Sequence, residues 1–254
     1  MKILMLSGGG KSSKYIYNAL SSNVKIDKVL IADSVSKRII IRRRIKKLGL
    51  LKVINQLAFQ FFAVKIITFL SQNTFKLKEK KLGLISKDFP EEKKVFLGKL
   101  NSKNTIKTLQ NNKADLIIVN GTSIISSKIL ECTEAIFINT HVGITPEYRG
   151  VHGGYWALRN DDENNFGVTV HLVDNGIDTG SIIYQKSINI DRKDNFITYP
   201  LLQTALAIPL IKKAIRDIEL NELKTFKKEN VKSKLYYHPS LTEYLYGLIF
   251  KGIK

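Results

Sequence analysis

The sequence predicts an α/β protein built on a layered sheet, and two observations carry that prediction. Short apolar runs alternate with longer amphipathic stretches as far as about residue 220, which is the pattern of strands covered by helices. The chain has 254 residues, of which 44% are hydrophobic and 25% are charged. That composition and length are typical of a globular protein with a sizeable core.

The expected elements follow one another in a regular order. Strands are expected at residues 2–6, 27–32, 114–121, 135–141, 166–174 and 181–190, and helices at 12–20, 102–110, 153–159 and 196–220. The run ADLIIVNG at 114–121 is apolar on both faces, which is typical of a buried parallel strand. From residue 224 a tail follows that ends in the aromatic-rich segment YYHPSLTEYLYGLIF.

An insert at about residues 36–75 interrupts this rhythm. It contains RRRIKKLGLLKVINQLAFQFF, in which apolar residues at helical spacing predict one or two amphipathic helices. No acidic residue lies between Ser34 and Lys78, and the basic residues there are Lys37, Arg38, Arg42, Arg43, Arg44, Lys46, Lys47, Lys52, Lys65, Lys76 and Lys78. Two roles stay open for the insert: packing against the core or a partner, and peripheral contact with an acidic membrane surface.

The overall charge and the cysteine count narrow the class of protein. The formal net charge of +19 favours encounters with anions such as nucleotides, nucleic acid or acidic lipid, although solvated surface charge is an equal reading. The single cysteine, Cys132, excludes an intramolecular disulfide framework and fits a reducing cytoplasm. We expect a cytoplasmic protein, because the N-terminal apolar run is too short for a signal peptide and no uninterrupted run reaches roughly 18 residues.

The stretch SGGGKSS at residues 7–13 looks at first like the end of a phosphate-binding loop. The P-loop pattern needs a glycine five residues before Gly10, and Met5 stands there inside the apolar run. The dinucleotide pattern fails too, since Ser13 follows where its third glycine belongs. What remains is a strand, a flexible turn and a helix start, whose free N–H groups can hold an anion. A plain strand-to-helix turn is the alternative.

Two polar side chains stand at the end of the strand expected at 135–141. Asn139 and His141 project to the same side of that strand because side chains alternate faces. Ligands bind at the carboxyl ends of strands in open α/β sheets. Asp178 follows in the turn NGIDTG, where Gly176 and Gly180 allow a sharp bend.

An amide, an imidazole and a carboxylate together suit the attack of a neutral amine on a carbonyl. Asn139 and His141 can donate hydrogen bonds to the oxygen that becomes negative, and Asp178 can orient the imidazole and accept the proton that the amine loses. Taken one at a time, each residue can also have a purely structural role. Asn139 can satisfy a turn at the strand end, His141 can fill a polar gap, and Asp178 can cap the backbone N–H groups of its turn.

In combination, these motifs resemble those of the folate-dependent formyltransferases, a family that includes the glycinamide ribonucleotide, methionyl-tRNA and amino-sugar enzymes. The resemblance rests on Asn139-Thr140-His141, on the loop from Pro146 to Gly150, and on the turn from Gly176 to Gly180, in that order and at the right spacing. It implies a Rossmann-like, mostly parallel sheet with flanking helices, and 10-formyltetrahydrofolate as the donor. It also implies a catalytic domain at residues 1–222, carrying the insert, and a C-terminal extension at 223–254.

The resemblance also implies roles for individual residues. Asn139, His141 and Asp178 become the catalytic trio, and no metal is expected. The pterin is expected to dock through the folate-binding residues Gly121, Thr122, Ser123, Ile124, Ile125, Val173, Asp174, Gly176 and Ile177. The acceptor is expected to meet Gly8, Gly9, Gly10, Lys11, Ser12 and Arg149, although an ion pair is an equal reading for Arg149. Of the other histidines, we expect His171 to be structural, His152 to face a helix start, and His238 to have no identifiable partner.

The acceptor follows less directly from the sequence. We expect a small phosphate-bearing amine and favour a nucleotide-linked amino sugar, because such enzymes often carry elements after the core and a diphosphate suits the positive charge. Glycinamide ribonucleotide is the alternative, and a non-catalytic folate or nucleotide sensor stays open. We expect no nucleic acid partner, because the tail is too short for the β-barrel domain of the tRNA enzyme. A homodimer, through self-association of the insert, is also considered.

Overall fold

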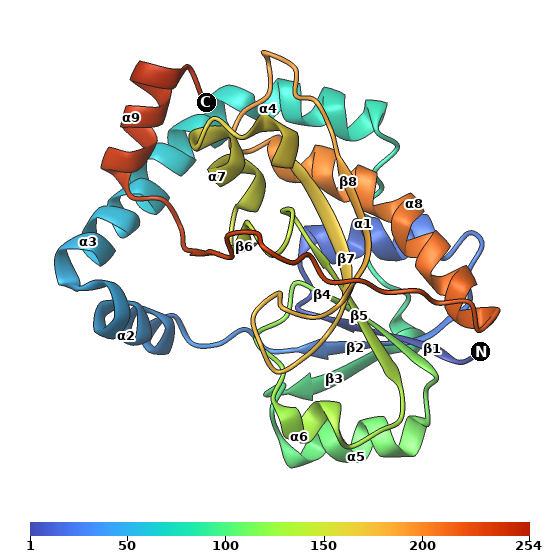
Figure 1. Cartoon of the computed structure of the whole chain (residues 1–254). Coiled ribbons are helices and arrows are strands. Elements are labelled where there is room, and N and C mark those ends of the chain that lie inside the picture. Colours follow the sequence, from blue (N-terminus) through green and yellow to red (C-terminus); the bar gives the residue numbers. More distant parts are fainter.

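A seven-stranded sheet forms the centre of the molecule (Figure 1). The structure is a computed structural model that describes residues 1–254. In spatial order the strands are β3 (Lys94–Gly98), β2 (Ile26–Ala32), β1 (Ile3–Ser7), β4 (Leu116–Asn120), β5 (Ile136–His141), β7 (Gly167–Leu172) and β8 (Ile182–Ser187). The strands from β3 to β5 pair in parallel, whereas β7 and β8 are antiparallel. The predicted fold class, a mostly parallel sheet with flanking helices, is confirmed.

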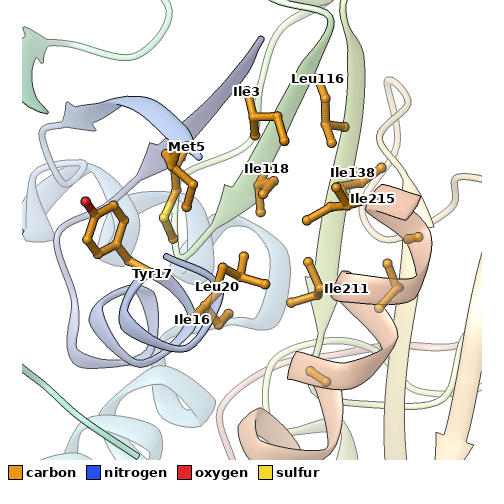
Figure 2. Close-up of a cluster of buried hydrophobic side chains, with 14 of the residues drawn as sticks. Ile3, Met5, Ile16, Tyr17, Leu20, Leu116, Ile118, Ile138, Ile211 and Ile215 are labelled. Carbon is orange, nitrogen blue, oxygen red and sulfur yellow. The ribbon is translucent and has the colours of Figure 1, made fainter. Parts of the chain in front are cut away.

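The alternation of apolar side chains along the strands divides the core into two layers. Ile3 and Met5 of β1 face one layer, where α1 (Lys11–Leu20) and α8 (Tyr199–Glu219) cover the sheet. Figure 2 shows this layer, with Ile16 of α1 and Ile211 of α8 meeting the strand residues. Leu4 faces the opposite layer, which α5 (Lys103–Asn112) and α6 (Ser127–Leu130) cover. Burial on both faces explains why these strands are apolar throughout.

The insert forms a helical arm outside the sheet. It consists of α2 (Lys37–Leu48), α3 (Leu50–Ala58), a π-helical turn (Phe59–Ala63) and α4 (Val64–Lys81). The predicted amphipathic helices are therefore present, but they continue beyond residue 75 to Lys81. By length and composition alone, the continuous helix Leu50–Lys81 could cross a membrane, and only 17% of its most apolar 18-residue window is buried. No membrane span was expected from the sequence, because no uninterrupted apolar run is long enough. The helix Leu50–Lys81 is long and apolar enough even though Lys65 lies inside it.

The tail packs back onto the domain instead of leaving it. Strand β9 (Leu235–Tyr236) pairs with β6 (Arg149–Gly150), and α9 (Leu241–Lys251) lies beside α3 (Figure 1). Tyr236 and Tyr244 of the tail join an aromatic cluster with Phe59 of the insert and Trp156 of α7 (Gly153–Arg159). The insert, α7 and the tail thus share one satellite core.

Several elements were not expected from the sequence, and β3 and α9 are the longest of them. Strand β3 is short and lies at the sheet edge, where it pairs only with β2 and leaves Phe96 exposed, so its pattern carries little apolar periodicity. Helix α9 is held by a capping box between Ser240 and Glu243, a start signal that the sequence displays as S-x-x-E. Short 3₁₀ turns at Glu91–Lys93 and Glu163–Asn165 complete the structure.

Candidate active site

The carboxyl ends of β1, β4 and β5 bring three sequence motifs to one edge of the sheet. These strands are adjacent and parallel, so the turn after Ser7, the loop after Asn120 and the polar end of β5 lie in a row. Gly8 approaches the next strand so closely that a Cβ atom there would lie 2.1 Å from the carbonyl oxygen of Gly121. A glycine is therefore required for this junction.

Asn139 of β5 lies directly opposite His171 of β7 in the antiparallel pair. The Asn139 Nδ2 atom is 3.3 Å from His171 Nε2, and His171 Nδ1 is 2.7 Å from the carbonyl oxygen of Leu172. The carbonyl can only accept, so Nδ1 carries the proton and Nε2 accepts from the amide. Burial lowers the pKa of His171, which favours this neutral form.

His141 is buried between two oxygen atoms. Its Nε2 lies 2.6 Å from the carbonyl oxygen of Tyr148, and its Nδ1 lies 3.3 Å from Asp178 Oδ2. Both neighbours are acceptors, so an imidazolium with two N–H groups satisfies the arrangement. In this state neither nitrogen is free, and donating to a substrate oxygen requires His141 to exchange one contact.

Asp178 is held in a left-handed backbone conformation, with φ of 51°, which aspartate tolerates better than most residues. Its Oδ2 accepts a hydrogen bond of 2.9 Å from the Gly150 backbone N–H. Oδ1 accepts no hydrogen bond, and it lies 3.8 Å from His171 Nε2. Gly180 allows the turn to close, because a Cβ atom there would meet the Leu172 carbonyl oxygen at 1.7 Å.

The structure therefore brings the predicted trio of Asn139, His141 and Asp178 together and places His171 beside both Asn139 and Asp178. The contact between His171 and Asn139 was not expected, because the register of an antiparallel pair is not visible in one strand. The signal that the sequence does carry is the run GVTVHL, which places a histidine near the end of a mostly apolar strand.

Arg149 links two of the predicted motifs. Its Nη1 donates a hydrogen bond of 3.0 Å to the carbonyl oxygen of Ile177, next to Asp178. It forms no ion pair with a carboxylate, and its buried Nε atom has no partner. Arg149 thus ties the loop after β5 to the turn that carries Asp178.

The two segments expected to hold the pterin lie on the same side of the sheet. Val173 packs against the buried cluster that contains Ile125, and its N–H donates to the Phe137 carbonyl oxygen at 2.9 Å. The loop Gly121–Ser126 is held by Asn101, whose Nδ2 donates to the carbonyl of Ile124 and whose Oδ1 accepts from the N–H of Ser126, both at 2.9 Å.

On the other segment, Asp174 closes the turn by accepting hydrogen bonds from the N–H of Gly176 and the hydroxyl of Thr179. The Ile124 side chain, on the loop Gly121–Ser126, is 57% exposed to solvent. Both segments are thus fixed in shape while an apolar side chain stays open for contact. Asn101 was not singled out from the sequence, and no motif marks it.

A cavity of about 110 Å³ opens beside Asp178. Its lining comes from the loop after β5, the turn at Asp178 and the tail: Thr145, Pro146, Asp178, Thr179, Gly180, Ile182, Lys227 and Lys228. Lys228 pairs with Glu147 at 2.9 Å, and Lys227 forms no salt bridge. The tail thus contributes positive charge to the edge of the site.

The glycine turn after β1 is built mainly on its neighbours. The hydroxyls of Ser12 and Ser13 donate to Asn120 Oδ1 at 3.1 and 2.8 Å. Lys11 extends toward the insert, where its ammonium lies 2.8 Å from Glu79 Oε1 and 4.5 Å from the ring centre of Phe75. No side chain caps α1. Phosphate binding by Gly8, Gly9, Gly10, Lys11 and Ser12 stays a prediction.

The two remaining histidines lie outside the trio and contact each other. His152 Nε2 is 3.0 Å from His238 Nδ1, so His238 does have a partner. Burial lowers the pKa of His152 to about 3 and that of His238 to about 4, with the nearby charge of Arg44 adding to both shifts. This pair joins α7 to the tail.

Solved structures with a similar fold include three formyltransferases. They are a sugar N-formyltransferase from Shewanella sp FDAARGOS_354 (TM-score 0.58, 16% identity, 93% of this chain and 76% of that one), the N-formyltransferase from Helicobacter canadensis in complex with folinic acid and dTDP-3-aminofucose (0.58, 19%, 93% and 70%), and phosphoribosylglycinamide formyltransferase from Anaplasma phagocytophilum (0.58, 16%, 93% and 98%). At these identities the likeness establishes the fold.

Sequence relatives include methionyl-tRNA formyltransferases. That of Thermodesulfovibrio yellowstonii is 38% identical over 116 residues, which cover 42% of this chain and 37% of the relative. That of Prochlorococcus marinus strain MIT 9515 is 30% identical over 151 residues, which cover 56% and 46%. The chain thus spans less than half the length of these relatives. The model of the formyl transferase family matches residues 1–200, and the chain therefore belongs to the formyl transferase family.

Proposed function

We propose that this chain is an enzyme that moves a formyl group from 10-formyltetrahydrofolate to the primary amine of a small anionic acceptor. The observation that carries the proposal is the meeting of Asn139, His141 and Asp178 at one sheet edge, with contacts of 3.3 Å from Asn139 to His171 and from His141 to Asp178. These groups match the needs of amine attack on a carbonyl. The family match supports the same reaction.

Each residue of the site has one task in this proposal. Asn139 uses one N–H of its amide on His171, which leaves the second N–H for the formyl oxygen as negative charge develops there. His141 places a positive charge beside the same centre when both of its nitrogens are protonated. Asp178 accepts the proton that the amine loses, and its Oδ1 is the oxygen available because Oδ2 already accepts from Gly150.

The segments at residues 121–126 and 173–177 fit a flat, hydrogen-bonding ring such as a pterin. Asn101 and Asp174 hold them rigid, and their backbone amides and carbonyls offer the donors and acceptors that such a ring needs. When bound, 10-formyltetrahydrofolate would supply the formyl group, and tetrahydrofolate would leave as the bond between the formyl carbon and its nitrogen breaks. The structure of the Helicobacter canadensis relative was determined with folinic acid, a chemically related molecule.

For the acceptor we favour a nucleotide-linked amino sugar, a precursor of surface polysaccharide. Two of the fold relatives are named as sugar formyltransferases, and the structure of a third, from Helicobacter canadensis, was determined in complex with dTDP-3-aminofucose. Two features near the site suit a diphosphate. The cation Lys227 lines the cavity at Asp178, and the first backbone N–H groups of α1, which can hold an anion, follow the glycine turn.

Glycinamide ribonucleotide is the second candidate. The Anaplasma phagocytophilum relative is matched over 98% of its length, so this chain contains the whole of that compact fold. The same match covers 93% of this chain. Both acceptors present an amine and at least one phosphate, so the fold does not separate them.

A steady-state assay separates the candidate acceptors. The full chain is incubated with 10-formyltetrahydrofolate and one amine at a time, and tetrahydrofolate release is followed; the panel contains 4-amino and 3-amino sugars linked to dTDP or UDP, glycinamide ribonucleotide, and initiator methionyl-tRNA. We expect the highest kcat/KM for an amino sugar nucleotide. A higher kcat/KM for the ribonucleotide selects the second candidate, and formylation of the tRNA contradicts both.

A further inference from the structure

An uncovered apolar surface runs along the continuous helix Leu50–Lys81. Its side chains are between 53% and 83% exposed and recur mainly at neighbouring positions or at spacings of three or four; we name them the apolar ridge: Leu50, Leu51, Ile54, Phe61, Phe62, Ile66, Phe69 and Leu70. Contiguous apolar surface of this kind marks a binding face for a partner or a membrane.

The opposite side of the same helix is fastened to the domain along its length. Near the start, the Gln56 side chain donates a hydrogen bond of 2.7 Å to the carbonyl of His238. Farther along, the Ser71 hydroxyl accepts one of 2.8 Å from Asn195, and Lys78 pairs with Asp194 at 2.8 Å. A helix tied at both ends in this way cannot cross a bilayer without losing those contacts. It can lie flat, with the ridge outward.

A cluster of cations precedes the ridge on α2. No residue of α2 is buried, and the exposed basic residues are Lys37, Arg38, Arg42, Arg43, Lys46 and Lys47. None of them forms a salt bridge with a carboxylate, and the chain has no acidic residue between Ser34 and Lys78. We name these six residues the α2 cation cluster. Their charge is left for an anionic partner.

Helix α9 extends the apolar surface beside α3. The two helices are joined by Lys52 with Glu243 at 2.5 Å and by Asn55 with Thr242 at 3.0 Å. The side chains of Ile249 and Phe250 on α9 are 68% and 71% exposed. Figure 1 shows α9 standing beside the insert on the side away from α5 and α6.

We propose that the apolar ridge and the α2 cation cluster dock this protein onto a membrane surface that carries anionic lipid. The helix lies parallel to the bilayer, its ridge enters the boundary between headgroups and acyl chains, and the cations meet lipid phosphates. Charge complementarity selects this occupant. A second copy of the chain brings the same cations and no acidic stretch in its insert to match them, whereas an anionic headgroup layer supplies the missing negative charge.

The docking surface starts at the functional edge of the sheet. Helix α2 follows β2, whose carboxyl end lies at the same edge as those of β1, β4 and β5. Docking therefore holds that edge near the headgroups. The proposal rests on the insert alone and stands whether or not the formyl-transfer proposal holds.

Co-sedimentation of the full chain with vesicles tests the proposal. We expect pelleting with mixed phosphatidylglycerol and phosphatidylcholine vesicles, weak pelleting with phosphatidylcholine alone, and release by high salt or alkaline carbonate. The triple variant Arg42→Gln, Arg43→Gln and Lys46→Gln should weaken partitioning about 100-fold, since each cation at such a surface contributes roughly a factor of five. The variant Phe62→Ser, Ile66→Ser and Phe69→Ser should abolish it.

Matched controls replace equally exposed residues far from the insert. The variant Lys103→Gln, Lys107→Gln and Lys128→Gln on α5 and α6 has the same charge change, and Phe96→Ser removes an exposed aromatic from β3. Both should pellet like the unmodified chain. All variants change exposed side chains, and far-ultraviolet circular dichroism checks that they fold.

Three results would overturn the proposal. The first is no pelleting with anionic vesicles. The second is resistance to carbonate, which indicates a spanning helix. The third is a dimer in light scattering that the ridge variant disrupts, together with vesicle binding that the ridge variant leaves unchanged; that result assigns the ridge to a second copy of the chain.

Discussion

Asn139 and His171 face each other across the antiparallel pair of β5 and β7, with Asn139 Nδ2 3.3 Å from His171 Nε2. The same imidazole donates from Nδ1 to the Leu172 carbonyl oxygen. The amide orientation of Asn139 therefore depends on a neutral His171 whose tautomer is set by its own backbone.

His171 is predicted to act as a positioning residue. His171→Leu removes the acceptor for the Asn139 amide, and we expect kcat to fall about tenfold, the value of one hydrogen bond to a polar group, with a smaller change in KM for the donor. In the unmodified enzyme, protonation of His171 Nε2 at low pH removes the acceptor for the Asn139 amide and should lower kcat. The variant lacks this group, so the acid limb of its kcat–pH profile should differ from that of the unmodified enzyme. His171→Gln should restore part of kcat. A role in packing alone predicts equal losses in both variants and an unchanged pH profile.

Asn139→Ala should lower kcat about 10² to 10³-fold, the usual cost of one donor to a developing oxyanion. The affinity for the folate donor should stay near that of the unmodified enzyme, as measured by fluorescence titration, because the expected pterin contacts come from other segments. Thr140→Ala is the matched control, since it lies on the same strand and faces the other side. Equal losses from both variants would show a general disturbance of β5.

Asp178→Asn should lower kcat by 10² to 10⁴-fold, the range for a lost general base, without unfolding the turn. Asparagine adopts the left-handed conformation of this position and keeps an oxygen for the Gly150 N–H. Far-ultraviolet circular dichroism should therefore show the same fold as for the unmodified protein. A turnover number within tenfold of the unmodified enzyme would exclude Asp178 as the proton acceptor.

The buried pair His152 and His238 should make the fold sensitive to acid. Their lowered pKa values, about 3 and about 4 against an unfolded value of 6.5, mean that the unfolded chain binds protons first. The folded state therefore has its full stability above about pH 6.5 and becomes less stable, relative to the unfolded chain, as the pH falls. At pH 5 each histidine should cost about 2 kcal/mol of unfolding free energy.

Urea denaturation at pH 7 and pH 5 measures this loss. The variant His152→Asn and His238→Gln keeps polar side chains, and asparagine tolerates the left-handed backbone at position 152. It should show a clearly smaller difference between the two pH values. A loss below about 1 kcal/mol in the unmodified protein would contradict the assignment.

Much of this architecture follows from patterns that a single sequence displays. Two strands, Ile3–Ser7 and Leu116–Asn120, were predicted because each is a short and almost wholly apolar run. The helix Gly153–Arg159 was also predicted. Asn139 and His141 could be paired because alternation on one strand is a local property. Asp178 was singled out by its glycine-rich turn, but its place beside His141 rested on the family resemblance, since nothing local in NGIDTG brings the two together.

What could not be predicted depends on contacts between distant segments. The register that sets His171 against Asn139 and the reach of Lys11 to Glu79 are tertiary facts. The same holds for His152 and His238, which are 86 positions apart. Asn101 supports the loop at Ile124 through side-chain hydrogen bonds that no motif encodes.

In the proposed reaction, this chain transfers a formyl group with Asn139 as an oxyanion donor. The most direct test supplies 10-formyltetrahydrofolate labelled in its formyl carbon together with the amine panel, and follows the label into the product amide. We expect label on one phosphate-bearing amine with the unmodified chain, and at least about 10²-fold slower labelling with Asn139→Ala. Tight folate binding with no label on any amine would exclude formyl transfer and indicate a sensor on this scaffold.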